Sequence, residues 1–182
     1  MMNKNRLFAF SYSIHSITLL AMFIASHVIL TRFLSIPIST SIRISFGFFP
    51  IALTGLLLGP ISAMVVGGIG DLLGALFFPI GPFYFGFTLT AILSGLIYGS
   101  CLFRKTPVRL YHVILSKLIA DLLLNIGLNS LWIHHLYGQA MMAILPARAL
   151  KNLVQFPIDA ALLYSVIILI THVPDRYLKK LK

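Results

Sequence analysis

The chain has no glutamate, a single cysteine and few charged residues of either sign. Charged residues make up 10% of its 182 residues, whereas 59% are hydrophobic; an ordinary soluble domain has roughly 25% charged residues. This composition excludes a water-soluble monomer, and the lone Cys101 excludes an internal disulfide framework. Because a membrane-spanning helix needs about 20 apolar residues, the chain can supply about six spans and little else.

The motifs of several enzyme classes are missing as well. No Gly-Lys dipeptide occurs, so the chain lacks a Walker-type phosphate loop and cannot hydrolyse ATP by that route. It has no Gly-x-Ser-x-Gly elbow and no paired-acid dyad, so the sequence contains no recognisable set of catalytic residues for hydrolysis. The six histidines lack the spacing of metal ligands, since His15 and His27 would lie on different faces of one helix. We therefore expect neither an enzyme nor a metal site.

Basic residues outnumber acidic ones by 14 to 4, which gives a net charge of +10. Such an excess can indicate nucleic-acid binding, but here the basic residues flank apolar segments and form no basic face with interleaved aromatics. If the N-terminus is inside, nine basic residues fall at the cytoplasmic ends of the apolar segments and four at the outer ends. The positive-inside rule then predicts that both termini are cytoplasmic.

Hydropathy predicts an all-α membrane protein with six transmembrane helices, formed by residues 1–182 as a single domain. The apolar run after the basic N-terminus is too long for the core of a signal peptide, and we interpret it as a retained first helix. The predicted spans cover residues 7–30, 46–59, 61–78, 84–103, 110–134 and 147–172. The second and third are short and are separated by Gly59-Pro60.

Four polar residues recur at every fourth position of the fifth span: Lys117, Asp121, Asn125 and Asn129. This spacing places them along one stripe of the helix. A charge inside a span costs about 2.5–3.5 kcal/mol on the insertion scale, so each one needs a partner or a function. For Lys117 and Asp121 the spacing favours an ion pair within the helix, which Asp159 of the sixth span could join.

For Asn125, Asn129 and Arg148, ligand binding and hydrogen bonding between helices explain the sequence equally well. Asp71 differs from them because no basic residue stands within four positions of it. We therefore predict that Asp71 pairs with a distant group or binds a ligand. The neighbouring Gly70 and Gly74 are expected to allow close approach of helices.

An aromatic, glycine- and proline-rich loop, residues 77–87, follows the third span. Its aromatic rings suit a belt at the membrane interface, and they could equally stack on a flat ligand ring. The loop at residues 35–45 contains Arg43 and could close over the same outer mouth, although a lone arginine in a loop is more often solvated.

Taken together, these segments resemble the substrate-binding (S) components of energy-coupling factor vitamin transporters, specifically the folate group. The similarity covers most of the chain and rests on Ser41-Ile42-Arg43-Ile44-Ser45-Phe46 with Pro50, Gly59-Pro60, Asp71-Leu72-Leu73-Gly74, the loop with Pro79 and Gly81, Gly86-Phe87-Thr88-Leu89, the segment from Asn125 to Trp132, and Arg148, Lys151 and Pro157. The resemblance implies a vitamin receptor of the cell membrane, bacterial by analogy, with an outward-facing pocket. It would dock on a transmembrane coupling subunit and two cytoplasmic ATPases, which would account for the missing Walker motif.

Folate chemistry suggests a role for each candidate residue. The pterin ring offers two parallel N–H donors that the carboxylate of Asp71 could accept, and the glutamyl tail carries two carboxylates. The predicted ligand-binding residues are Arg43, Asp71, Phe83, Tyr84, Phe87, Asn125, Asn129, Trp132, Arg148 and Lys151, with folate as the transported ligand and no cofactor. Another vitamin such as pantothenate, or a small membrane subunit without a transport role, remains an alternative.

The resemblance also implies a docking face for the coupling subunit on the first helix. Ala21 and Ala25 stand one turn apart there and would form a small-residue face. Ordinary packing against a neighbouring helix explains the same pattern nearly as well.

Overall fold

The fold is built almost entirely from helices, as the hydropathy predicts. A computed structural model describes residues 14–37, 43–105, 107–138 and 141–171. In chain order the elements are α1 (Ile14–Val28), η2 (Ile29–Phe33), β1 (Ile36–Pro37), β2 (Arg43–Ile44), α2 (Phe48–Leu58), α3 (Pro60–Phe77), α4 (Phe85–Leu102), α5 (Leu110–Ile119), η3 (Ala120–Leu128), α6 (Asn129–Tyr137) and α7 (Met141–Thr171), where η marks a π-helix. The two short strands pair antiparallel, with Ile36 opposite Ile44.

Five helices of the described residues are long and apolar enough to cross a membrane, judged by length and composition. Two of them are composite, because α1 continues into η2 and α5 continues through η3 into α6. The sixth segment, α2, has 11 residues. At about 1.5 Å per residue, its length is about half of the roughly 30 Å thickness of the hydrocarbon core. Six complete spans therefore stay a prediction. So do the cytoplasmic termini, since residues 1–13 and 172–182 lie outside the described part.

The second to fifth predicted spans agree with the observed helices to within three residues at each end. Glycine explains two of these ends. Gly59, between α2 and α3, has a φ of +95°, and Gly138, after α6, has a φ of +64°, a region that side-chain-bearing residues rarely adopt. In contrast, α7 begins six residues before the predicted start and keeps Pro146 and Pro157 within the helix, as membrane helices tolerate.

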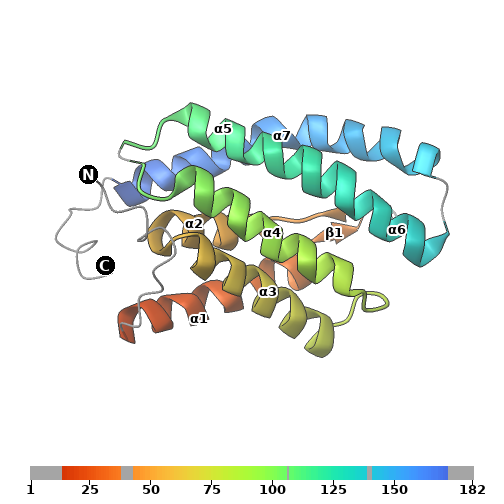
Figure 1. The fold of residues 1–182 in the computed structure, drawn as a ribbon, viewed down its shortest axis with the longest axis horizontal. Coiled ribbons are helices and arrows are strands. Elements are labelled where there is room, and N and C mark those ends of the chain that lie inside the picture. The colour runs from red at the N-terminus through yellow and green to blue at the C-terminus, as the bar shows by residue number, and fades with distance from the viewer. Residues whose placement is uncertain (1–13, 38–42, 106, 139–140, 172–182) are drawn as a thin grey trace.

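Helices α3 and α4 pack against each other in the middle of the molecule. Figure 1 shows α7 alongside α5 and α6 at one edge, α1 at the opposite edge, and α3 and α4 between them. A Cβ on Gly95 of α4 would lie 2.5 Å from the backbone of Met64, and one on Gly55 of α2 would lie 2.8 Å from that of Gly99. Helices therefore approach each other closely at these glycines.

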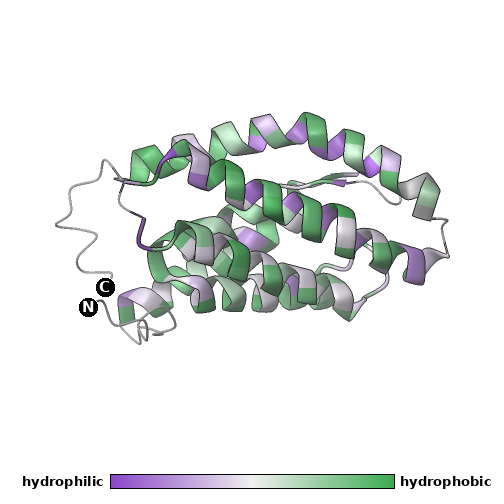
Figure 2. Cartoon of the chain, turned by 45° about the horizontal axis from the view of Figure 1, so that its top comes forward, coloured by the Kyte–Doolittle hydropathy of each residue, from purple (hydrophilic) through white to green (hydrophobic). Residues whose placement is uncertain are grey.

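Apolar side chains cover most of the outer surface. Figure 2 shows hydrophobic residues over most of the helices, with hydrophilic residues recurring along α7 and along the helix beside it. Leu153 of α7, for example, is 72% exposed, whereas Asp159 on the same helix is completely buried. An apolar exterior around buried charges is the arrangement that a lipid bilayer requires.

Candidate ligand-binding site

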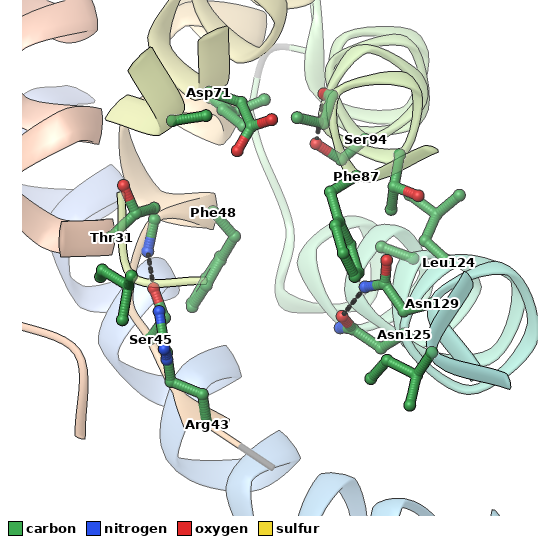
Figure 3. Close-up of a pocket in the computed structure, with 18 of the residues that line it drawn as sticks. Thr31, Arg43, Ser45, Phe48, Asp71, Phe87, Ser94, Leu124, Asn125 and Asn129 are labelled. Atoms are coloured by element: carbon green, nitrogen blue, oxygen red, sulfur yellow. Dashed lines mark hydrogen bonds between the residues drawn. The ribbon is translucent and has the colours of Figure 1, made fainter. Parts of the chain in front are cut away.

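A cavity of about 840 Å³ lies among the helices, and its lining comes from both halves of the chain. This volume falls within the usual range for small-molecule sites, about 300–1,000 Å³. In Figure 3, Thr31, Arg43 and Phe48 lie on one side, Phe87, Asn125 and Asn129 lie on the other, and Asp71 lies between the two groups. The first half of the chain thus supplies one wall, and the second half supplies the polar stripe of η3 and α6.

Asp71 lines this cavity and is held by two residues that are distant in the sequence. Arg32 Nη2 donates to Asp71 Oδ1 at 3.2 Å, and Thr88 Oγ1 donates to Asp71 Oδ2 at 2.7 Å. These contacts confirm the expectation that Asp71 finds a partner outside its own helix. Each carboxylate oxygen has a second lone pair, so Asp71 can still accept hydrogen bonds from a ligand.

The glycines beside Asp71 make room for side chains from the first helix. A Cβ on Gly74 would lie 2.6 Å from Nε of Arg32, and one on Gly70 would lie 2.7 Å from Cδ2 of His27. We predicted that Gly70 and Gly74 would bring helices together, and the structure shows that they admit these two side chains. His27 Nδ1 is in turn hydrogen-bonded to the carbonyl oxygen of Gly47 at 2.8 Å.

The predicted aromatic residues Phe83, Tyr84 and Phe87 all line the cavity. The rings of Tyr84 and Phe87 meet edge to face with centroids 6.0 Å apart. Trp132, which we predicted as a fourth ligand contact, is absent from the described lining. It packs against Tyr84 with centroids 5.6 Å apart, and its Nε1 donates to Thr90 Oγ1 at 3.0 Å. Trp132 therefore supports the aromatic wall from behind.

A buried cluster of three charges lies at the Phe48 end of the cavity. Lys117 Nζ is 3.1 Å from Asp121 Oδ1 and 2.9 Å from Asp159 Oδ2, and it lies 4.1 Å from the centre of the Phe48 ring. The predicted ion pair of Lys117 with Asp121 is confirmed, and Asp159 joins it. Since Lys117 and Phe48 both line the cavity, this cluster borders it.

The two predicted asparagines form a chain of hydrogen bonds that starts from the same cluster. Asn125 Nδ2 donates to Asp121 Oδ1 at 2.6 Å, and Asn129 Nδ2 donates to Asn125 Oδ1 at 3.3 Å. Both asparagines line the cavity. These side-chain hydrogen bonds run along one helix. The bond between helices in this group is made by Arg148, whose Nη1 donates to the backbone oxygen of Asn125.

The three predicted cations also reach the cavity. Arg43 comes from β2, and Arg148 and Lys151 come from α7. Arg148 Nη1 donates to the backbone oxygen of Asn125 at 2.8 Å, and Lys151 Nζ donates to Asn152 Oδ1 at 3.4 Å. The position of Lys151 at the outer mouth stays a prediction.

Sequence reasoning missed His27 and Arg32 as cavity residues, and Thr88 as a partner of Asp71. Arg32 ends an apolar segment, so its charge is indistinguishable in sequence from one that orients the helix in the membrane. The other two predicted residues, Ala21 and Ala25, are both exposed on α1 and lie away from the cavity.

Comparison with known proteins shows similarity to transport proteins. Residues 15–167 match the family model "ECF transporter, substrate-specific component". The folate transporter FolT of Clostridium novyi (strain NT) is 38% identical over 146 residues, which is 80% of this chain and 84% of that protein. FolT of Leuconostoc mesenteroides subsp. mesenteroides is 34% identical over 155 residues, 82% of each chain. A crystal structure of FolT bound with folic acid superposes with a TM-score of 0.79 at 35% identity, covering 85% of this chain and 93% of that one.

Proposed function

Because the chain belongs to the family of substrate-specific components of ECF transporters, we propose that it is the folate-binding S component of such a transporter. A component of this family binds the transported substrate and is not an enzyme. The five apolar helices and the family together identify a multi-pass membrane protein. Since the matched relatives are bacterial, we place it in a bacterial plasma membrane.

The carboxylate of Asp71 is the observation on which the folate assignment rests. It lines a cavity of the right size, and Arg32 and Thr88 hold its two oxygens in place. The 2-amino group of a pterin and the adjacent ring N–H are parallel donors that one carboxylate accepts together. Asp71 would thus bind the pterin end, and Phe83, Tyr84 and Phe87 would pack against the flat rings.

The charge of the cavity suits a ligand with two negative charges. Five basic side chains line it: Arg32, Arg43, Lys117, Arg148 and Lys151. Three carboxylates, one in the lining and two bound to Lys117, leave an excess of two positive charges. The glutamyl tail of folate carries two carboxylates, so we assign the tail to Arg43, Arg148 and Lys151, with Asn125 and Asn129 along the wall between the two ends.

Replacing Lys151 with methionine is expected to weaken folate binding about 10- to 100-fold, because a buried hydrogen bond to a charged group contributes about 1.5–3 kcal/mol. Binding of pteroate, which lacks the glutamyl tail, should change less than threefold. Calorimetric titration of the detergent-solubilised variant with both ligands measures this difference. The exposed Lys105→Met is the matched control. Equal losses for folate and pteroate would contradict the assignment of the tail.

The energy for uptake would come from partners, since the sequence contains no Walker-type motif. We propose that the chain docks on a transmembrane coupling subunit that carries two ATPases. The exposed small residues Ala21 and Ala25 on α1 are the proposed contact, because small side chains let helices approach closely.

Introducing tryptophan at both Ala21 and Ala25 should abolish co-purification with the coupling module and leave the folate Kd within a factor of two. The bulky rings would hold the partner helix away, and both positions lie outside the cavity. Ala161→Trp, at an exposed alanine of α7, is the matched control and should assemble normally. Undiminished assembly of the double variant would refute this docking face.

A further inference from the structure

Asp121 lies outside the described cavity lining and is hydrogen-bonded to residues that belong to it. The described lining includes Lys117, Asn125 and Asn129 of this helix but not Asp121 itself. Asp121 Oδ1 nevertheless accepts from Lys117 and from Asn125, and Asn125 accepts in turn from Asn129. One carboxylate outside the lining is therefore joined through the amide of Asn125 to Asn129, which lines the cavity.

This chain of hydrogen bonds has only one satisfactory direction. An ionised carboxylate only accepts hydrogen bonds, so Asn125 must turn its NH2 group toward Asp121. Its oxygen then faces Asn129, which must turn its own NH2 group toward Asn125. Figure 3 shows this arrangement, with the nitrogen of Asn129 toward Asn125 and the oxygen pointing the other way.

The far end of the chain is an acceptor with nothing bound to it. Oδ1 of Asn129 is buried and has no hydrogen-bond partner in the structure. The same is true of Oε1 of Gln155, on the facing α7, which also lines the cavity. A buried acceptor without a partner costs free energy. A ligand donor would remove this cost by bonding the acceptor, once the side chains that cover it adjust.

We propose that Asp121 is a positioning residue that fixes Asn129 as a hydrogen-bond acceptor, so that the pocket selects ligands with an N–H donor opposite Asn129. The inference rests on the proposed folate function. Folate has such donors beyond the pterin edge that Asp71 would bind, namely the amine between the pterin and benzoyl rings and the amide N–H of the glutamyl linkage. Asp121 acts on the ligand only through Asn125 and Asn129.

The Asp121→Leu variant removes the acceptor that fixes this direction. Asparagine would not serve, because its oxygen could accept from both Lys117 and Asn125 as Asp121 Oδ1 does. Leucine cannot accept from Asn125, whereas Lys117 keeps its partner Asp159 at 2.9 Å. The amides of Asn125 and Asn129 are then free to turn round, and Asn129 can present NH2 to a ligand donor. Loss of the negative charge at position 121 would by itself strengthen binding of an anionic ligand, whereas loss of the fixed acceptor at Asn129 would weaken it. The two effects therefore have opposite signs.

The test is a calorimetric double-mutant cycle with folic acid and the full-length protein in detergent. We expect D121L and N129L each to weaken binding about tenfold, and D121L to add less than twofold in the N129L background. The charge-conserving swap D121N/N129D should bind within threefold of wild type, because a carboxylate at position 129 accepts from Asn125 and still offers an oxygen to the ligand.

Three results would overturn the proposal: unchanged or tighter binding by D121L, full additivity with N129L, or no recovery in the swap. Thermal unfolding without folate shows whether each variant is folded. If D121L does not fold, unchanged binding by N129L overturns the proposal, and tenfold weaker binding by N129L with recovery in the swap supports it. If wild type itself does not bind folate, the proposed function fails, which is a separate outcome.

Discussion

Replacing Asp71 with alanine is expected to weaken folate binding by about 100-fold or more. Removing one partner of a buried, charged hydrogen-bonded pair costs about 2–5 kcal/mol, and Asp71 is the only acidic side chain among the described residues that line the cavity. Pteroate has the same pterin ring, so its affinity should fall equally. Titration of both ligands therefore separates this effect from that of Lys151→Met, which should spare pteroate.

Thr88→Val is the matched control for this experiment. It removes one of the two hydrogen bonds that position Asp71 and leaves the carboxylate and its ion pair with Arg32 intact. A loss of about three- to tenfold is expected, since a single hydrogen bond contributes about 0.5–1.5 kcal/mol. If Asp71→Ala binds folate as tightly as wild type while remaining folded, Asp71 does not bind the pterin.

Replacing Lys117 with methionine should have the largest effect on stability. It leaves the carboxylates of Asp121 and Asp159 buried without the cation that both contact, and breaking a buried pair in this way costs about 3–5 kcal/mol. For a chain of this size the unfolding temperature in detergent should fall by about 10 °C. Thermal unfolding without ligand measures it directly.

The double variant K117M/D159N tests the reason for that loss. Neutralising Asp159 removes one of the two unpaired charges, so the double variant should unfold at a higher temperature than K117M alone. A double variant less stable than K117M would show that the lysine acts through its packing on Phe48 and not through charge. The exposed Lys105→Met should unfold like wild type.

The helices were predictable because a membrane-spanning helix needs a continuous run of apolar residues, which is a local feature of the sequence. A run of apolar residues is sufficient to indicate a span, and Gly59-Pro60 marked the break between α2 and α3 correctly. The ion pair of Lys117 with Asp121 was predictable for the same reason, since both charges lie one turn apart on one helix.

Contacts between distant segments could not be derived from spacing. Arg32 and Asp71 are 39 residues apart, and only the packing of η2 against Gly74 brings them together. The partners of Trp132 were equally hidden: an aromatic residue on the polar stripe suggests a ligand contact, whereas in the structure its N–H donates to Thr90 and its ring packs against Tyr84. The π-helical turns of η3, which contain Asp121 and Asn125, have no signature in the sequence.

The central claim is that this cavity binds folate. Calorimetric titration of the purified wild-type protein with folic acid, followed by pantothenate as the competing vitamin, tests it most directly. We predict saturable binding of one folate per chain and no heat of binding with pantothenate. Saturable binding of pantothenate, or a folded protein that takes up no folate, would contradict the proposed function.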